Sequence, residues 1–189
     1  MADQLYLSYW LRGFTGPNML RHFSIMLGKF PFSRLSPPAV LRVRAVDETE
    51  PVVFERGFEE PQPGEILAAS KEFVHPDSAL EINGKWDIWQ FDQEWKVSPA
   101  RVSLWAMAPG FSREGGEDLR IDFGIDSNFL PQPETGESFL PVQSNIRSLL
   151  HLVHELDDAL AVERRQLWTE SGENFAEKLQ EALKAPRLQ

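Results

Sequence analysis

The chain has no cysteine in its 189 residues, which removes disulfides, thiolate nucleophiles and cysteine-ligated zinc from consideration. It also has no apolar run near the roughly 18 residues that span a bilayer. Its first residues, MADQLYLSYWLRG, have neither the basic start nor the small-residue cleavage site of a secretory signal. We therefore expect a cytoplasmic protein with no membrane partner.

The familiar catalytic signatures are missing as well. The sequence has no G-x-S-x-G elbow, no G-x-x-x-x-G-K-[ST] loop, no G-x-G-x-x-G, no H-E-x-x-H and no EF-hand loop. These absences count against common hydrolases, P-loop enzymes, dinucleotide enzymes and zinc proteases. A site built from scattered residues remains open, so the catalytic residues are unknown and no cofactor is expected.

Positive charge is scarce relative to negative charge. Nineteen Lys and Arg residues face 29 Asp and Glu residues, for a net charge of −10, which argues against nucleic acid as a partner. Residues 1–46 carry six basic and one acidic residue, whereas residues 47–143 carry seven basic and twenty acidic ones. This asymmetry predicts docking between the two segments, inside one molecule or between copies. Solvated ion pairs of little energetic weight are the alternative.

The composition is that of an ordinary folded domain. A hydrophobic fraction of 42% with 25% charged residues is too apolar for a disordered chain. The length fits one domain over residues 1–189. Alternating apolar residues predict strands, and apolar residues at helical spacing predict helices. The strands are expected at residues 5–12, 39–46, 51–58, 100–108, 117–126 and 162–171, and the helices at 17–30, 142–160 and 174–183.

Residues 59–85 give no clear pattern beyond a short helix near Gly64–Phe73 and an Asn83-Gly84 pair of the type found in hairpin turns. The predicted order is β-α-β-β, an undefined middle, then β-β-α-β-α. We therefore predict an α+β fold, with a mostly antiparallel sheet and two main helices packed on one face. The proline-rich segment SNFLPQPETGESFLP is expected to be a packed surface loop or a functional lid.

The segment HLVHELDD offers the best candidate for a metal site. His151, His154 and Asp158 stand at spacings that bring side chains together on a helix. A helical wheel places His151 opposite the apolar stripe, and the other two at its margin beside Arg147. We interpret them as a solvated helix surface and expect no metal.

The segment RIDFGID places Arg120, Asp122 and Asp126 on one face of a strand. The two acids could act as a catalytic pair, but four strand residues span about 13 Å, more than such pairs use unless Gly124 bends the strand. An ion pair between Arg120 and Asp122 is the simpler interpretation. Asp122 and Asp126 remain candidates for ligand binding.

The segment WDIWQFDQEW, residues 86–95, is the densest aromatic and acidic stretch. Neither strand nor helix periodicity gives it a single apolar face. We interpret its indole rings as core residues whose N–H groups bond to neighbouring carboxylates. The alternative is a recognition patch for a cationic side chain or a sugar. Its candidate binding residues are Trp86, Asp87, Trp89, Asp92 and Trp95.

These observations favour a non-enzymatic domain that binds a protein with a basic surface, or a second copy of itself. The alternative is a hydrolase-like enzyme whose site combines Asp122, Asp126, His154 and the tryptophans of residues 86–95. That enzyme requires all of these groups to line one concavity.

Overall fold

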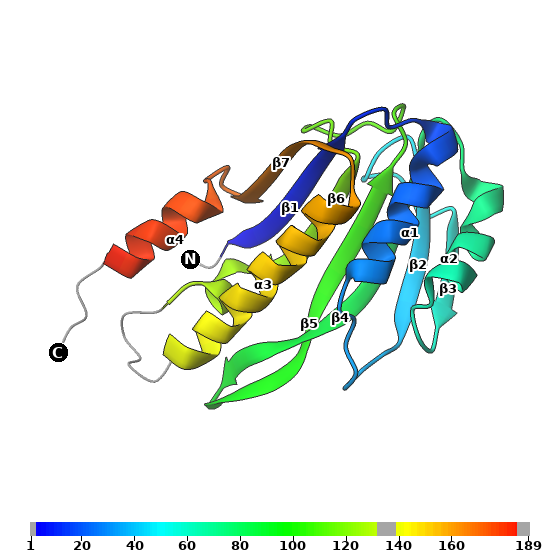
Figure 1. Ribbon diagram of the computed structural model, residues 1–189. Helices are drawn as coiled ribbons and strands as arrows, with labels where there is room; N and C mark the ends of the chain where they lie inside the picture. Colours follow the sequence, from blue (N-terminus) through cyan, green and yellow to red (C-terminus); the bar gives the residue numbers. More distant parts are fainter. Residues whose placement is uncertain (1–2, 132–138, 185–189) are drawn as a thin grey trace.

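The computed structural model describes residues 3–131 and 139–184 of the chain. In this part of the protein, seven strands form one antiparallel sheet with the spatial order β3-β2-β4-β5-β6-β1-β7 (Figure 1). The strands are β1 Gln4–Leu11, β2 Ala39–Ala45, β3 Phe54–Phe58, β4 Ser78–Asp92, β5 Glu94–Met107, β6 Leu119–Ile125 and β7 Val162–Thr169. The helices are α1 Met19–Lys29, α2 Pro63–Ser70, α3 Phe139–Ala159 and α4 Phe175–Lys184.

The predicted α+β class with a mostly antiparallel sheet is confirmed, but the predicted order of elements is incomplete. The undefined middle, residues 59–85, contains α2 and the first part of β4, a strand of 15 residues that continues through the aromatic segment to Asp92. The Asn83-Gly84 pair forms no turn and lies inside β4. A Cβ atom at Gly84 would come within 2.9 Å of Phe32 Cε1, so any other residue there would displace this ring. The hairpin instead reverses at Gln93, which takes a positive φ of 64°.

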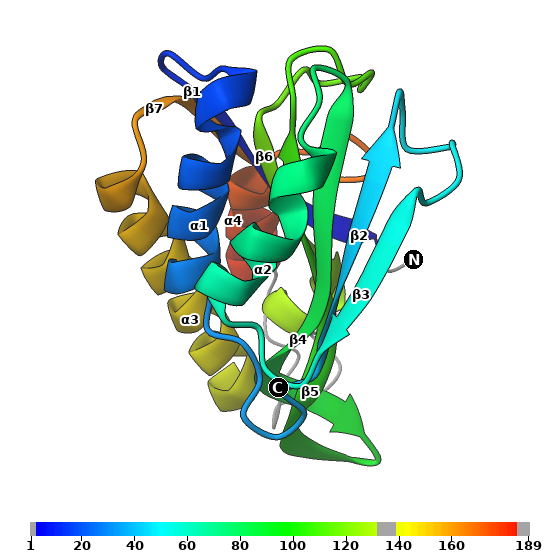
Figure 2. The ribbon, with the colours of Figure 1, turned by 90° about the vertical axis from the view of Figure 1, so that its right-hand side faces the viewer.

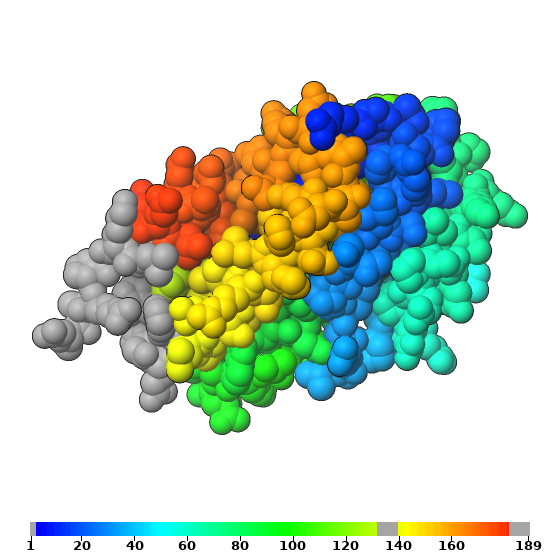
Figure 3. All heavy atoms as spheres, in the orientation of Figure 1, coloured from blue at the N-terminus to red at the C-terminus, as the bar shows by residue number. Residues whose placement is uncertain are grey.

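Helices α1, α2 and α3 lie on one face of the sheet, and α4 follows β7 at one edge (Figures 1 and 2). Alternate residues of β1, Leu5, Leu7, Tyr9 and Leu11, are buried under the helices, as their spacing predicts. Figure 3 shows α1 and α3 packed side by side over the covered face, with the tip of the β4–β5 hairpin emerging beyond them. The other face of the sheet carries no helix of the described residues (Figure 2).

The apolar stripe of α3 differs at one position from the stripe that helical spacing predicts, which consists of Val142, Ile146, Leu149, Leu150, Val153, Leu156 and Leu160. Val142, Leu149, Val153 and Leu156 are buried as expected, but Leu150 is 54% exposed. The buried position is taken by Leu152, which the predicted stripe did not include. Residues 132–138 of the predicted proline-rich loop lie outside the described part, and α3 begins at Phe139, before the expected residue 142.

The basic amino-terminal segment meets the acidic segment within the same molecule. Arg42 of β2 pairs with Glu55 of β3 at 2.8 Å, as expected from the hairpin, and Arg44 lies 3.5 Å from Glu81 of β4. No helix in the described ranges is both long and apolar enough to cross a membrane.

Candidate functional site

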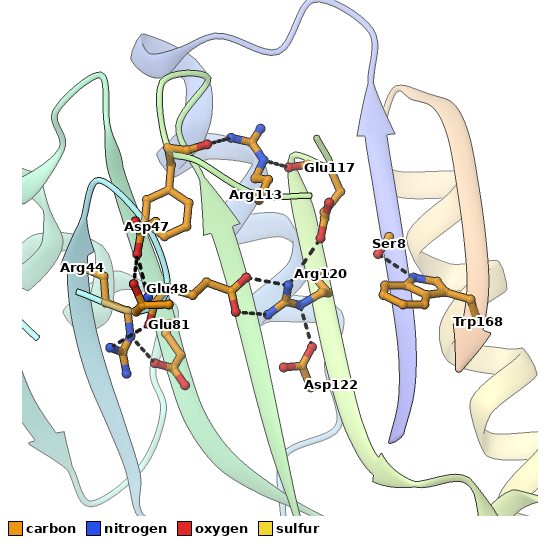
Figure 4. Close-up of polar contacts among 12 residues, drawn as sticks. Ser8, Arg44, Asp47, Glu48, Glu81, Arg113, Glu117, Arg120, Asp122 and Trp168 are labelled. Atoms are coloured by element: carbon orange, nitrogen blue, oxygen red, sulfur yellow. Dashed lines mark hydrogen bonds and ion pairs between the residues drawn. The ribbon is translucent and has the colours of Figure 1, made fainter. Parts of the chain in front are cut away.

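On the uncovered face of the sheet, β6 carries Arg120, a nearly buried arginine that is only 9% exposed. Its guanidinium makes a two-pronged contact with Glu48, in which Nη1 donates to Oε1 at 2.8 Å and Nη2 donates to Oε2 at 3.2 Å. Nε donates to Asp122 Oδ1 at 2.8 Å, and Nη1 also lies 3.4 Å from Glu117 Oε1. Figure 4 shows the three carboxylates converging on this one cation. The predicted pair of Arg120 and Asp122 is therefore present, but it belongs to a buried network.

Two aromatic rings complete the surroundings of Arg120. Its Cζ atom lies 5.1 Å from the ring centre of Trp105 and 5.7 Å from that of Tyr6, both distances typical of cation–π contacts. Burial alone would lower the pKa of Arg120, but Asp122 and Glu48 raise it. Arg120 therefore stays charged at all physiological pH values.

Three carboxylates around one cation leave this network with excess negative charge. Burial raises the pKa of Asp122 to about 6, although Arg120 pulls it down, and the charges of Glu48 and Glu81 raise it further. A carboxyl group with such a pKa exchanges its proton near neutral pH. A perturbed pKa of this kind is frequent at functional sites and also occurs in structural ion-pair networks.

Glu48 reaches Arg120 from the loop between β2 and β3, residues 46–53. This loop is held at its base, where Ser112 N donates to Val46 O at 2.7 Å and Val46 N donates to Asp77 O at 2.9 Å. Val46 has a φ of 74°, in the left-handed region that β-branched residues strongly disfavour. Strain of this kind persists where surrounding contacts enforce it, and it is common at binding and catalytic sites.

The second loop over this face joins β5 to β6, residues 108–118. Arg113 braces it from inside, since Nη1 donates to both Ala108 O and Phe111 O, and Nε donates to Glu117 O. Glu117 is 3% exposed, and its Oε2 atom has no hydrogen-bond partner among the described residues. The guanidinium of Arg113 thus donates its hydrogen bonds within the loop, whereas Glu117 Oε2 accepts none from the described residues.

Two tryptophans flank the network, Trp10 of β1 and Trp168 of the edge strand β7. The indole Nε1 of Trp10 donates to Gly115 O at 3.2 Å, and Arg164 of β7 stacks on its ring with Cζ 3.6 Å from the centre. Trp168 of β7 packs against Tyr6 at 4.7 Å between ring centres, and its Nε1 donates to Ser8 Oγ at 3.0 Å (Figure 4).

These groups enclose a hollow of about 900 Å³, which we call the Trp168 hollow. Its volume is in the range of sites that hold small ligands or one peptide side chain with its flanking residues. It is lined by Ser8, Trp10, Asp47, Glu48, Thr49, Ser112, Arg113, Glu114, Gly115, Glu117, Arg120, Arg164, Gln166, Trp168, Glu170, Ser171 and Gly172.

The charges that remain accessible in the Trp168 hollow are mainly negative. Arg113 and Arg120 are engaged with internal partners, and Arg164 covers Trp10. By contrast, Glu114 and Glu170 are exposed and form no ion pair with any residue in the described ranges. The surface can therefore offer carboxylates and an indole ring to a cationic group.

The structure separates the tryptophans of residues 86–95. Trp86 is 4% exposed and packs against Phe30, Phe123 and Phe129 on the covered face, which confirms its interpretation as a core residue. Trp89 and Trp95 are partly exposed near the end of the β4–β5 hairpin, where Phe91 lies 5.6 Å from Trp95.

The carboxylates of residues 86–95 do not accept indole N–H groups in the described part of the chain, so that expectation is wrong. Asp87 instead binds the loop before β2, accepting hydrogen bonds from Ser33 Oγ and the backbone of Arg34 and Leu35. These bonds lower the pKa of Asp87 although burial opposes them. Asp92 is exposed at the hairpin tip, 3.5 Å from Lys96.

The residues of the predicted enzyme site do not share one concavity. Asp122 faces the uncovered side of the sheet, whereas Trp86 is buried on the covered side. Asp126 lies beyond the end of β6, where it accepts the backbone N–H of Asp3 and pairs with Lys178 at 2.7 Å. His154 projects into solvent from α3.

His154 lies 3.4 Å from Asp158, and His151 is exposed on the same helix, in keeping with a solvated surface. Within the described ranges, no group of three His, Asp or Glu side chains is arranged to hold a metal ion.

Sequence reasoning missed most residues of the Trp168 hollow. The one available signal was the alternation expected for a strand at residues 5–12, which puts Tyr6, Ser8 and Trp10 on the face opposite Leu5, Leu7, Tyr9 and Leu11. It did not show that β1 lies between β6 and β7, which brings Arg120 and Trp168 to either side of it. No protein-family model, no curated protein and no solved structure matches this chain.

Proposed function

We propose that the protein is a non-enzymatic binding module that takes a cationic side chain of a partner protein into the Trp168 hollow. One observation carries this proposal: the buried arginines of the hollow are satisfied internally, whereas Glu114 and Glu170 are exposed and form no ion pair with any described residue. These two carboxylates line the same hollow as Trp168. A carboxylate rim next to an indole attracts a lysine or arginine side chain by charge and by cation–π contact.

The net negative charge of the whole chain also favours a positively charged partner. The chain carries a net charge of −10, so a basic partner is drawn toward it over long distances. We expect association that is fast at low ionic strength and weakens with added salt. A cytoplasmic location and self-association stay predictions from the sequence.

Binding of labelled oligolysine and oligoarginine peptides, followed by fluorescence polarisation, tests this function. The double variant Glu114→Gln/Glu170→Gln should weaken binding by about tenfold at low salt, since each carboxylate contributes on the order of 1 kcal/mol. The control variant Glu59→Gln/Glu72→Gln makes the same change in net charge at two exposed residues elsewhere. Equal loss in both variants, or no binding by the native protein, would refute the proposal.

The enzyme alternative is favoured by one group, Asp122, whose pKa is raised to about 6 by burial. A general base with such a pKa works near neutral pH. If the protein is a hydrolase, a panel of ester, glycoside and phosphate substrates should reveal turnover that Asp122→Asn abolishes. Turnover that survives this substitution would exclude Asp122 as the base.

A further inference from the structure

The uncovered face of the sheet contains a second hollow, of about 480 Å³, which shares no lining residue with the Trp168 hollow. We call it the Lys85 hollow. It lies over β2, β4, β5 and β6 and is lined by Gln4, Pro38, Val40, Arg42, Asn83, Gly84, Lys85, Arg101, Val102, Ser103, Asp122 and Gly124. Its charged lining is mostly basic, in contrast to the protein as a whole.

Two cations face each other across the floor of this hollow. Lys85 of β4 and Arg101 of β5 are direct cross-strand partners, so their side chains stand on the same face of the sheet. Like charges in this arrangement destabilise a sheet. Neither side chain forms an ion pair with any residue that the structure describes, and Lys85 Nζ donates only to Ser36 Oγ, at 2.7 Å. An acidic protein thus leaves two adjacent cations without a carboxylate partner.

A free hydrogen-bond donor stands next to these cations. Asn83 lies two residues before Lys85 on the same face of β4, and its Oδ1 accepts a hydrogen bond from Ser103 Oγ at 2.8 Å. This bond orients the side-chain amide, whose Nδ2 is buried and has no acceptor in the described part of the chain. A buried N–H group without an acceptor costs on the order of 1–3 kcal/mol, which an oxygen of a ligand would recover.

The other charged groups of the hollow are already occupied. Arg42 donates to Glu55 Oε2 at 2.8 Å, and Asp122 accepts from Arg120 at 2.8 Å. Gly124 has a φ of 77° and no side chain to cover the end of the hollow next to Asp122. The open donors are therefore Lys85, Arg101 and Asn83.

We infer that the Lys85 hollow binds a small organic anion through its carboxylate or phosphate group. Lys85 and Arg101 supply the charge, and the amide of Asn83 supplies a directed donor to one oxygen. Charge-assisted hydrogen bonds of this kind are the strongest that side chains make. The volume is at the lower end of the range for small-molecule sites. Nucleic acid is disfavoured by the overall negative charge of the protein. The inference does not depend on the function of the Trp168 hollow.

Isothermal titration with inorganic phosphate, citrate and glucose 6-phosphate as probes tests this inference, with glucose as the neutral comparison. Native protein should bind at least one of the anions and not glucose. Lys85→Gln/Arg101→Gln should lose about tenfold or more in affinity for that anion. The control Lys71→Gln/Arg147→Gln removes the same charge from exposed residues of the helical side.

Thermal unfolding gives a second, independent readout. Arg101→Gln should raise the melting temperature of the free protein, because it removes the like-charge pair, and should reduce the stabilisation that the anion provides. Equal affinity in the double variant and the control, or no binding of any anion by the native protein, would overturn the inference. A lower melting temperature of Arg101→Gln with unchanged anion affinity would also overturn it.

Discussion

The two faces of the sheet are built from alternate residues of the same strands and differ in what they bury. On β6, Leu119, Ile121 and Phe123 are at most 1% exposed beneath the helices. Between them, Arg120 and Asp122 face the two hollows. The covered face buries hydrocarbon, and the uncovered face buries charge.

This difference separates the face that stabilises the fold from the face that we propose for binding. Hydrocarbon burial is non-directional and favourable, so the covered face holds the sheet and its helices together. Buried charges cost solvation and repay it only in part, so the network around Arg120 is weak evidence for a stabilising role. Its carboxylates, aromatic rings and strained loop are the features on which the proposed binding of a cationic side chain rests. The substitutions below measure how far the two faces differ.

The largest effect is expected at Trp86, which packs against three phenylalanines on the covered face. Trp86→Ala should lower the free energy of unfolding by about 3–5 kcal/mol because it leaves a large cavity. Trp168→Ala, at a partly exposed ring of the uncovered face, should cost about half as much or less. Urea unfolding of both variants checks this, and equal losses would contradict the division between the faces.

Arg120→Met should also destabilise the protein strongly, by about 3 kcal/mol. The substitution leaves Glu48, Glu117 and Asp122 close together without their cation. Adding Glu48→Gln to this variant should restore part of the loss, since it removes one uncompensated charge. Urea unfolding of the single and double variants gives this coupling. A double variant less stable than Arg120→Met would argue against charge repulsion as the cause.

The pH dependence of the free energy of unfolding should reveal the raised pKa of Asp122. Its pKa is raised to about 6 in the folded protein by burial, from an ordinary value of 3.8. Its contribution to stability is therefore fully present below about pH 3.8 and lost as the pH rises through about 6. Asp122→Asn cannot ionise, so its stability relative to the native protein should increase over this interval.

Urea unfolding of both proteins across the same pH series measures this difference. The pKa of Asp3 is lowered to about 2, chiefly by a hydrogen bond from Ser171. Because Asp3 is present in both proteins, its effect on stability cancels in the difference between them. A stability difference independent of pH would show that Asp122 has an ordinary pKa.

The smallest effect is expected at Val46, whose positive φ strains the base of the loop that carries Glu48. Val46→Gly should raise the free energy of unfolding by about 1 kcal/mol, because glycine adopts this conformation without steric cost. Val53→Gly, at an exposed valine in the same loop segment without a positive φ, is the matched control and should not stabilise. Thermal unfolding of the two variants distinguishes strain relief from a general effect of glycine.

The sequence predicted the covered face more completely than the uncovered one. Buried leucines of β1 and the stripe of α1 repeat with the period of their element, so each reports its own environment. Periodicity does not report the surroundings of Ser8, Trp10 and Arg120. Polar and aromatic residues on an outward face can contact solvent, a ligand or the side chains of another strand. The aromatic stretch of residues 86–95 drew attention by its composition, yet Trp86 is a core residue.

By itself, the sequence determined the α+β class, most of the strands, the main helices and the face of each that turns inward. These follow from contacts between residues near in the chain, which local periodicity records. Only the tertiary structure decided where the two hollows lie. Glu48 and Arg120 are 72 residues apart and meet because the loop between β2 and β3 reaches over the uncovered face to β6. Ser8 and Trp168 are 160 residues apart and meet because the sheet places β1 next to β7. Strand order is set by packing of the whole chain, so no local pattern of residues could reveal it.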